Sequence, residues 1–161
     1  MTVDVRKYEE KDLPAMMEIW NGIVEKGEAF PQEQPLTLEQ AREFFQGQSF
    51  TGVAEGDGQV VGLYILHPNN VGRCGHISNA SYGVDETVRG GGIGRALVEH
   101  SLKMGKELGF GLLQFNAVVS TNESAIYLYE QLGFVKIGGV PGGFRKKDGT
   151  FEDILLFYHV L

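Results

Sequence analysis

Two kinds of hydrophobic periodicity mark the first third of the chain. Apolar and polar residues alternate over Val3 to Tyr8, which is typical of a half-buried strand. From Leu13 to Val24 the apolar residues recur every three or four positions, which predicts an amphipathic helix that begins near Pro14. Glycine and proline interrupt the pattern over Lys26 to Pro35, before a second predicted helix from about Leu36 to Phe45. We therefore expect a strand and two helices, with the intervening loop as a candidate substrate lid.

The next segment carries the signals of an antiparallel hairpin. Ser49 to Glu55 and Gln59 to Leu66 have the character of strands and flank the turn Gly56 to Gly58. Glycine accepts the positive φ that a tight turn requires, so these two strands are predicted to pair. A turn at Pro68 to Gly72 follows, and His76 to Val84 predicts the next strand.

The second half of the chain alternates helices with strands. A helix is predicted from Ile93 to Leu108, ended by Gly109 or Gly111. We expect it to pack on the sheet through Ile93, Leu97, His100, Met104 and Leu108. The remaining elements are a strand, a helix and two strands, predicted at Leu112 to Val119, Asn122 to Leu132, Phe134 to Val140 and Phe151 to Val160. This order predicts an α/β (α+β) fold, with a mixed, mostly antiparallel sheet of six to seven strands and helices on both faces.

Length and composition fit a single domain over residues 1–161. With 42% hydrophobic residues, a chain of 161 residues can supply a substantial core. The N-terminus lacks the basic and apolar segments of a secretory leader, and no apolar stretch approaches the ~20 residues of a membrane span. We therefore expect a soluble, cytoplasmic protein with no membrane partner.

Charge and cysteine content argue against several function classes. The 14 basic and 21 acidic residues give a formal charge of -7, which opposes nucleic acid as a partner, because nucleic-acid binding relies on clustered Lys and Arg. The single Cys74 cannot form an internal disulfide or a Cys-x-x-Cys pair. His67, His100 and His159 have no partners at metal-ligand spacing, so we expect no metal.

A basic, glycine-rich segment from Arg89 to Arg95 lies between a predicted strand and a predicted helix. Its glycines remove the Cβ atoms that would keep a ligand off the backbone. A helix N-terminus adds free N–H groups and roughly half a positive elementary charge, so the segment predicts a phosphate site. It is not a Walker loop, because Gly94 is followed by Arg95 and Ala96, and it lacks the glycine spacing of a dinucleotide fingerprint.

Two blocks of the sequence resemble one enzyme superfamily. Arg89-x-x-Gly92-x-Gly94 resembles the acyl-CoA pyrophosphate loop of the GCN5-related N-acetyltransferase (GNAT) superfamily. A second block is similar to another signature of the same superfamily and consists of Asn122, Ala125, Tyr129 and Leu132-Gly133-Phe134. The resemblance covers about residues 60 to 160. It implies that acetyl-CoA inserts where two central parallel strands, 76–84 and 112–119, splay apart.

The resemblance also implies roles for residues of the cofactor site. Backbone groups near Tyr82 and Val84 would orient the thioester, and Arg89 would contact the pyrophosphate. Tyr129 matches a tyrosine that donates a proton to the departing sulfur, with a purely structural aromatic as the alternative. Asn122 either caps its helix or contacts the pantetheine arm, or does both. The implied cofactor-binding set is Tyr82, Val84, Arg89, Gly90, Gly91, Gly92, Ile93, Gly94, Arg95, Asn122, Ala125 and Tyr129.

Asparagines on two predicted strands are candidate acceptor contacts. Strand interiors disfavour asparagine, yet Asn79 and Asn116 occupy the two strands that would border the acetyl group. They resemble a GNAT subgroup that includes fungal enzymes acetylating proline analogues such as azetidine-2-carboxylate, although this chain has Tyr129 where those enzymes carry tryptophan. The alternative is that both asparagines satisfy backbone groups. Phe30 and Glu28, in the candidate lid, complete the predicted substrate set.

We interpret the chain as an acetyl-CoA-dependent N-acetyltransferase that acetylates the amine of a small molecule by direct attack in a ternary complex. A covalent route through Cys74 lacks an obvious base. Two alternatives stay open, namely acetylation of a protein N-terminus or lysine, and a non-catalytic acyl-CoA-binding sensor. A homodimer through the last strands also stays open.

Overall fold

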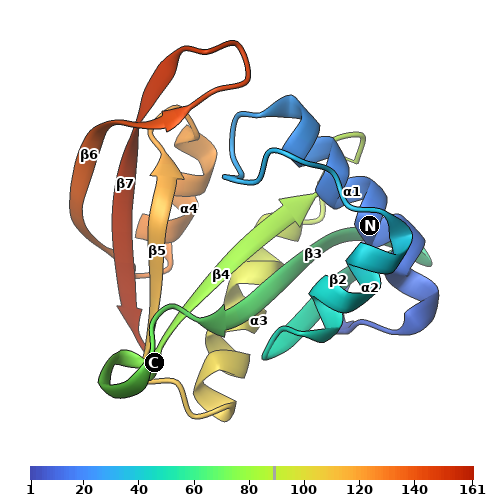
Figure 1. Cartoon of the computed structure of the whole chain (residues 1–161). Helices are drawn as coiled ribbons and strands as arrows, with labels where there is room; N and C mark the ends of the chain where they lie inside the picture. Colours follow the sequence, from blue (N-terminus) through green and yellow to red (C-terminus); the bar gives the residue numbers. More distant parts are fainter. Residues whose placement is uncertain (89) are drawn as a thin grey trace.

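The computed structural model describes residues 1–88 and 90–161 of the chain. Within these residues, seven strands form one sheet and four α-helices flank it (Figure 1), which confirms the expected fold class. The strands are β1 (Val3–Lys7), β2 (Phe50–Gly56), β3 (Gln59–Pro68), β4 (Ile77–Val84), β5 (Leu112–Val119), β6 (Val135–Arg145) and β7 (Phe151–Val160). The helices are α1 (Leu13–Lys26), α2 (Leu38–Gln46), α3 (Ile93–Glu107) and α4 (Glu123–Gln131), and short 3-10 turns cover Glu10–Asp12 and Gly72–Cys74.

The sheet is interrupted at its centre. Its strand order is β1-β2-β3-β4-β5-β7-β6, and every neighbouring pair is antiparallel except β4 and β5, which are parallel. The pairing of β4 with β5 covers only Ile77 with Leu112 and Ser78 with Leu113. Beyond these residues the two strands separate toward their C-terminal ends (Figure 1), as the resemblance implied.

Helices cover both faces of the sheet. On one face Trp20 of α1, together with α2, packs against Leu63 and Ile65 of β3. On the other face α3 and α4 pack against a core that includes Tyr64 and Leu66. Successive strand residues point to opposite faces, so β3 contributes to both cores. Within the described residues, no helix combines the length and the apolar character needed to cross a membrane.

The second helix begins later than the sequence pattern predicts. The prediction started it at Leu36, whereas α2 begins at Leu38. Leu36 has another partner, because its N–H donates to Oδ1 of Asn21 at 2.7 Å and its carbonyl accepts from Asn21 Nδ2 at 2.8 Å. Thr37 then caps the helix by accepting from the backbone N–H of Gln40 at 3.2 Å.

The inward face of α3 also differs from the prediction. Ile93 and Leu97 are buried as expected, and the half-buried His100 and Met104 also pack against the sheet, but Leu108 is exposed. The other buried residues of this helix are smaller, namely Val98, Ser101 and Gly105. Small side chains let the helix lie close to the sheet, and a pattern of large apolar residues does not reveal them.

The hairpin of β6 and β7 extends further than predicted. Strand β6 was expected to end at Val140, but its pairing resumes after an irregularity and continues to Arg145, opposite Phe151. The turn that follows is closed by the N–H of Lys146, which donates to the carbonyl of Thr150 at 2.7 Å.

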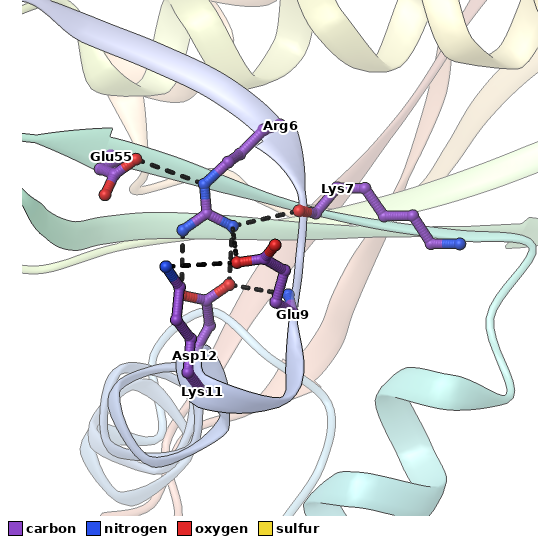
Figure 2. Close-up of polar contacts among 6 residues, drawn as sticks. All are labelled: Arg6, Lys7, Glu9, Lys11, Asp12 and Glu55. Carbon is purple, nitrogen blue, oxygen red and sulfur yellow. Dashed lines mark hydrogen bonds and ion pairs between the residues drawn. The ribbon is translucent and has the colours of Figure 1, made fainter.

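A partly buried ion pair fixes the start of α1 (Figure 2). Nη1 and Nη2 of Arg6, on β1, donate to the Asp12 carboxylate at 2.7 and 3.0 Å. The same carboxylate accepts from the N–H of Glu9 at 2.8 Å, and Nε of Arg6 donates to Glu55 of β2 at 3.3 Å. The Arg6 guanidinium holds the pKa of the buried Asp12 carboxyl below its ordinary value. The pair therefore joins two strands to the first helix.

We expect Asp12→Ala to lower the free energy of unfolding by about 2 kcal/mol, because it removes the closest partner of the Arg6 guanidinium and the acceptor of the Glu9 N–H. The pKa of Asp12 is lowered in the folded state, so its stabilisation is fully present above the ordinary value of 3.8 and is lost as the pH falls below it. The difference between wild type and variant should therefore shrink at lower pH. Urea unfolding at pH 7 and pH 3 measures both quantities.

Glu10→Ala is the matched control for this experiment. It breaks only the exposed pair of Glu10 with Arg42, in which Nε and Oε1 are 2.7 Å apart, and it should cost less than about 1 kcal/mol. If the two variants lose the same free energy of unfolding at pH 7, the Arg6–Asp12 pair contributes no more stability than an exposed ion pair.

Candidate active site

The gap between β4 and β5 exposes one backbone edge of β4. The N–H of Asp85 donates to the carbonyl of Val61 at 2.9 Å, so the odd-numbered residues of β4 turn their backbone groups toward β3. The carbonyl of His76 accepts instead from the segment that enters β5. Because these directions alternate along a strand, the backbone groups of Tyr82 and Val84 face the gap. The structure thus places both predicted residues where the described part of β5 does not pair with β4.

The loop after β4 adopts a conformation that requires glycine. The φ angles are +79°, +75° and +60° at Gly90, Gly91 and Gly92, a region that other L residues rarely adopt. Gly92 precedes α3 and offers no side chain as a cap, so the first N–H groups of the helix have no acceptor within it. They belong to Ile93, Gly94 and Arg95. Arg89, the predicted pyrophosphate contact, lies outside the described residues.

The side chains at the start of α3 have separate roles. Ile93 is buried in the core, so it offers only its backbone to a ligand. Nε of Arg95 lies 2.8 Å from Oε1 of Glu99, one turn along the exposed face of the helix. An anion would therefore compete with Glu99 for the Arg95 guanidinium.

Two cavities meet at the gap. The larger, of about 870 Å³, lies among α1, β4, α3 and α4. The predicted site residues in its lining are Glu28, Phe30, Tyr82, Val84, Gly94, Asn122, Ala125 and Tyr129. The smaller, of about 230 Å³, is lined mainly by β4 and β5. The predicted site residues in its lining are Phe30, Asn79, Tyr82, Asn116, Asn122 and Tyr129.

Tyr129 lies where the two cavities meet. Its ring packs on Phe115 and Phe134, with centroids 4.5 and 5.5 Å apart. Burial raises the pKa of the Tyr129 hydroxyl above its ordinary value of about 10, so the group stays protonated at neutral pH. The hydroxyl of Tyr82 is instead hydrogen-bonded to Oγ of Ser101 at 2.7 Å, beneath α3. Tyr129 is therefore the better placed of these two tyrosines to donate a proton at the junction.

Asn122 caps α4. Its Oδ1 accepts from the backbone N–H of Ala125 at 3.4 Å and from the hydroxyl of Ser124 at 3.3 Å. The capping role considered from the sequence is confirmed. Asn122 also lines both cavities, and these two bonds do not use its Nδ2 group.

Asn79 and Asn116 meet on a third asparagine that the sequence did not single out. Nδ2 of Asn79 donates to Oδ1 of Asn69 at 3.0 Å, and Nδ2 of Asn116 donates to the same oxygen at 2.5 Å. The sequence pattern identifies Asn69 only as part of a turn. Its contact with Asn116 joins residues 47 positions apart, and no local pattern reveals such a contact.

The loop after α1 covers one side of the gap. Phe30 packs on Trp20, with ring centroids 4.4 Å apart, and lines both cavities. Glu28 is exposed and lines only the larger one. The backbone N–H of Lys147, in the β6–β7 turn, donates to the carbonyl of Gly27 at 3.3 Å. The candidate lid is therefore braced by a hairpin distant in sequence, and of its two predicted substrate residues only Phe30 reaches the smaller cavity.

Among the described residues, charged groups line only the larger of the two cavities. Those of the larger cavity are Glu18, Lys26, Glu28, Asp85 and Glu86. The described residues that line the smaller cavity include no Asp, Glu, Lys, Arg or His. Across residues 1–88 and 90–161, no three His, Cys, Asp or Glu side chains gather as they would around a metal ion. The described lining of the smaller cavity thus offers no side-chain base, and the nearest histidine by register is His67, opposite Asn79 on β3.

Sequence comparison accounts for this architecture. The sequence profile of the Acetyltransferase (GNAT) family matches residues 13–134. The chain belongs to this family. The GNAT assignment makes it an acetyl-CoA-dependent N-acetyltransferase, in agreement with the two motifs that the sequence carries.

Similar GNAT proteins match over nearly the whole chain. N-acetyltransferase aca1 of Schizosaccharomyces pombe is 28% identical over an alignment 172 residues long. The alignment covers 95% of this chain and 82% of the relative. The putative phosphinothricin acetyltransferase YwnH of Bacillus subtilis is 29% identical over 156 residues, covering 93% and 94% of the two chains. A solved GCN5-related N-acetyltransferase from Kribbella flavida is 36% identical, covers 99% of this chain and 98% of its own, and superposes with a TM-score of 0.90.

We expect Gly91→Ala to destabilise this GNAT enzyme more than Gly90→Ala. Both residues have positive φ, so alanine is strained by about 1–2 kcal/mol at either position. Only at Gly91 would the added Cβ lie 2.9 Å from Cγ2 of Val3, whereas at Gly90 nothing lies within 4 Å. Thermal unfolding compares the two variants. Equal Tm values would show that the loop moves away from β1 at little cost.

Proposed function

We propose that the chain transfers the acetyl group of acetyl-CoA to the amine of a small molecule, an amino acid or amino-acid analogue, by direct attack in a ternary complex. The observation that carries this proposal is that Tyr129 lines both cavities. One cavity then holds the thioester donor and the other the acceptor, with the reacting atoms meeting beside Tyr129. Alignment of this kind supplies much of the rate enhancement in reactions of two substrates.

The larger cavity and the glycine loop suit the donor. A Cβ built on Gly90 or Gly92 would meet nothing within 4 Å, so the loop leaves room for a ligand, and the first amides of α3 suit its pyrophosphate. The backbone edge at Tyr82 and Val84 can pair with the amides of a pantetheine arm as a neighbouring strand would. From the sequence motif we assign Arg89 the role of a phosphate contact.

The reaction moves one acetyl group and one proton. The acceptor nitrogen attacks the acetyl carbon, the carbon–sulfur bond breaks, and the nitrogen loses a proton. We assign Tyr129 as the general acid, because its protonated hydroxyl can donate to the departing thiolate. The proton that leaves the amine restores the Tyr129 hydroxyl through solvent.

The lining of the smaller cavity makes the acceptor's own basicity important. An alkylamine with a pKa of about 10.4 is neutral in roughly one of several thousand molecules at pH 7. With no charged side chain in the described lining, solvent takes the proton. The rate should therefore rise with pH toward the pKa of the amine.

Size and lining favour a small acceptor. A volume of about 230 Å³ lies below the roughly 300–1,000 Å³ of pockets for drug-sized ligands. The name of the Bacillus subtilis relative, a putative phosphinothricin acetyltransferase, supports an acceptor that resembles an amino acid. We assign Asn79, Asn116 and Phe30 to acceptor contacts, and Glu28 to the outer rim.

The test of the function is CoA release from acetyl-CoA across a panel of amines. The panel holds azetidine-2-carboxylate, proline, phosphinothricin, other amino acids, polyamines, aminoglycosides, and peptides with free N-termini or lysines. Release with one small amine supports the proposal. Release only with peptides would replace it with protein acetylation, and binding of acetyl-CoA without any release would contradict it.

We expect Tyr129→Phe to lower kcat by about 10²- to 10⁴-fold, the range typical of a lost general acid. The dissociation constant for acetyl-CoA should change little, because the ring and its packing remain. The raised pKa of Tyr129 also predicts that the wild-type kcat shows no falling limb from this group up to about pH 9. CoA release over a range of pH measures kcat, and isothermal titration calorimetry measures the dissociation constant for acetyl-CoA.

Tyr127→Phe is the matched control, because Tyr127 lies on the same helix but is 66% exposed. It should keep wild-type turnover. A Tyr129→Phe enzyme that turns over at the rate of the control would remove Tyr129 from the mechanism.

Pairing of two copies is a separate proposal. Strand β6 is at the edge of the sheet, and the apolar side chains exposed on the β6–β7 hairpin are Val135, Ile137, Val140, Phe151 and Val160. We propose this hairpin as the contact of a homodimer, which light scattering would detect as twice the monomer mass.

A further inference from the structure

We propose that Asn69 is a positioning residue for the acceptor site, acting through Asn79 and Asn116 rather than by touching the acceptor itself. This inference rests on the proposed function, because it concerns the cavity to which we assign the amine. Asn79 and Asn116 line that cavity, whereas Asn69 is not part of its lining.

The backbone holds Asn69 in a fixed place beside the gap. It follows β3 directly, and its N–H donates to the carbonyl of Ile77, the first residue of β4, at 2.8 Å. The turn is thus attached to β4 just before the point where β4 and β5 separate. A side chain at this position can reach both strands.

The Asn69 side chain bridges the two strands where their ladder ends. Its Oδ1 accepts from Nδ2 of Asn79, on β4, at 3.0 Å and from Nδ2 of Asn116, on β5, at 2.5 Å. The last residue of β4 paired with β5 is Ser78, so Asn79 is the first without a partner on that strand. Two side-chain hydrogen bonds to one oxygen therefore continue the connection that the backbones no longer make.

The bridge restricts the two candidate contacts. One hydrogen of each Nδ2 group is held by Asn69, and Oδ1 of Asn116 also accepts from Nε2 of Gln114 at 3.0 Å. A ligand that fixes a freely rotating amide side chain reduces its conformational entropy, which weakens binding. A side chain that is already held does not incur this cost. Asn69 thus orients the remaining polar groups of both amides before the acceptor arrives.

Three variants test this geometry. Asn69→Ala removes the oxygen that accepts both hydrogen bonds. Asn69→Asp keeps two acceptor oxygens, so it should preserve both bonds as charge-assisted hydrogen bonds. Asn70→Ala is the matched control, because Asn70 is exposed in the same turn and its Oδ1 accepts only from the neighbouring N–H of Val71 at 2.7 Å.

The first measurement needs no amine substrate. Side-chain amide signals of Asn79 and Asn116 are recorded by ¹H–¹⁵N NMR, each assigned by its loss on replacement with alanine. We expect both pairs of signals to shift and their hydrogen exchange to accelerate in Asn69→Ala. In Asn69→Asp and Asn70→Ala the exchange should stay slow.

The second measurement uses the panel amine with the highest wild-type rate. We expect Asn69→Ala to raise the KM for that amine about tenfold, the effect of about one lost hydrogen bond, with the KM for acetyl-CoA unchanged. Asn69→Asp and Asn70→Ala should stay within about threefold of wild type.

The outcomes separate the two proposals. If wild type acetylates no panel amine, the proposed function fails, and the amide signals still decide whether Asn69 holds the two side chains. If Asn69→Ala lowers Tm but leaves the amide signals or the acceptor KM at wild-type values, Asn69 is only structural and the inference is overturned. If Asn69→Asp accelerates amide exchange and raises the KM for the amine as much as Asn69→Ala does, one oxygen of residue 69 does not accept both hydrogen bonds and the inference is overturned.

Discussion

The candidate site depends on the place where the hydrogen-bond ladder between β4 and β5 ends. Two residue pairs hold these strands together, and past Ser78 the facing edge of β4 has no strand partner among the described residues. A backbone edge without partners is costly unless water or a ligand satisfies it. The sheet tolerates the gap because β4 pairs along its length with β3, and β5 pairs with β7. The interruption therefore has an intact sheet on each side.

Packing on both faces keeps the two sides of the gap apart. One core joins α1 and α2 to β3, while the other joins α3 and α4 to the opposite face. At the base of the gap, the ring of Phe115 lies against those of Tyr82, Tyr129 and Phe134, with centroids 5.8, 4.5 and 4.7 Å apart. These rings belong to the core on the face covered by α3 and α4. The strands on both sides of the gap are thus held by packed side chains, while the gap itself stays open to the two cavities.

The sequence predicted the order of elements and local backbone features better than contacts between distant residues, for physical reasons. The glycine loop and the asparagine cap of α4 are local, so their backbone requirements appear in neighbouring residues. The start of α2 was wrong because Leu36 bonds to Asn21. The predicted inner face of α3 was wrong at Leu108 and missed Ser101 and Gly105, which are buried although they are not large apolar residues. Asn69 was missed since its partners are distant in sequence.

The brace between Lys147 and Gly27 attaches the lid to a hairpin that can diverge independently of the glycine loop. The glycine loop, the backbone edge of β4 and the start of α4, which we assign to the donor, come from one continuous stretch of the chain, whereas α1 and Phe30 complete the same cavity. The wall formed by Phe30 is supported from a hairpin at the other end of the chain. A substitution or insertion in that hairpin can reshape the wall while the glycine loop and the backbone edge of β4 stay unchanged. Evolution can therefore change the choice of amine while the donor chemistry is inherited intact.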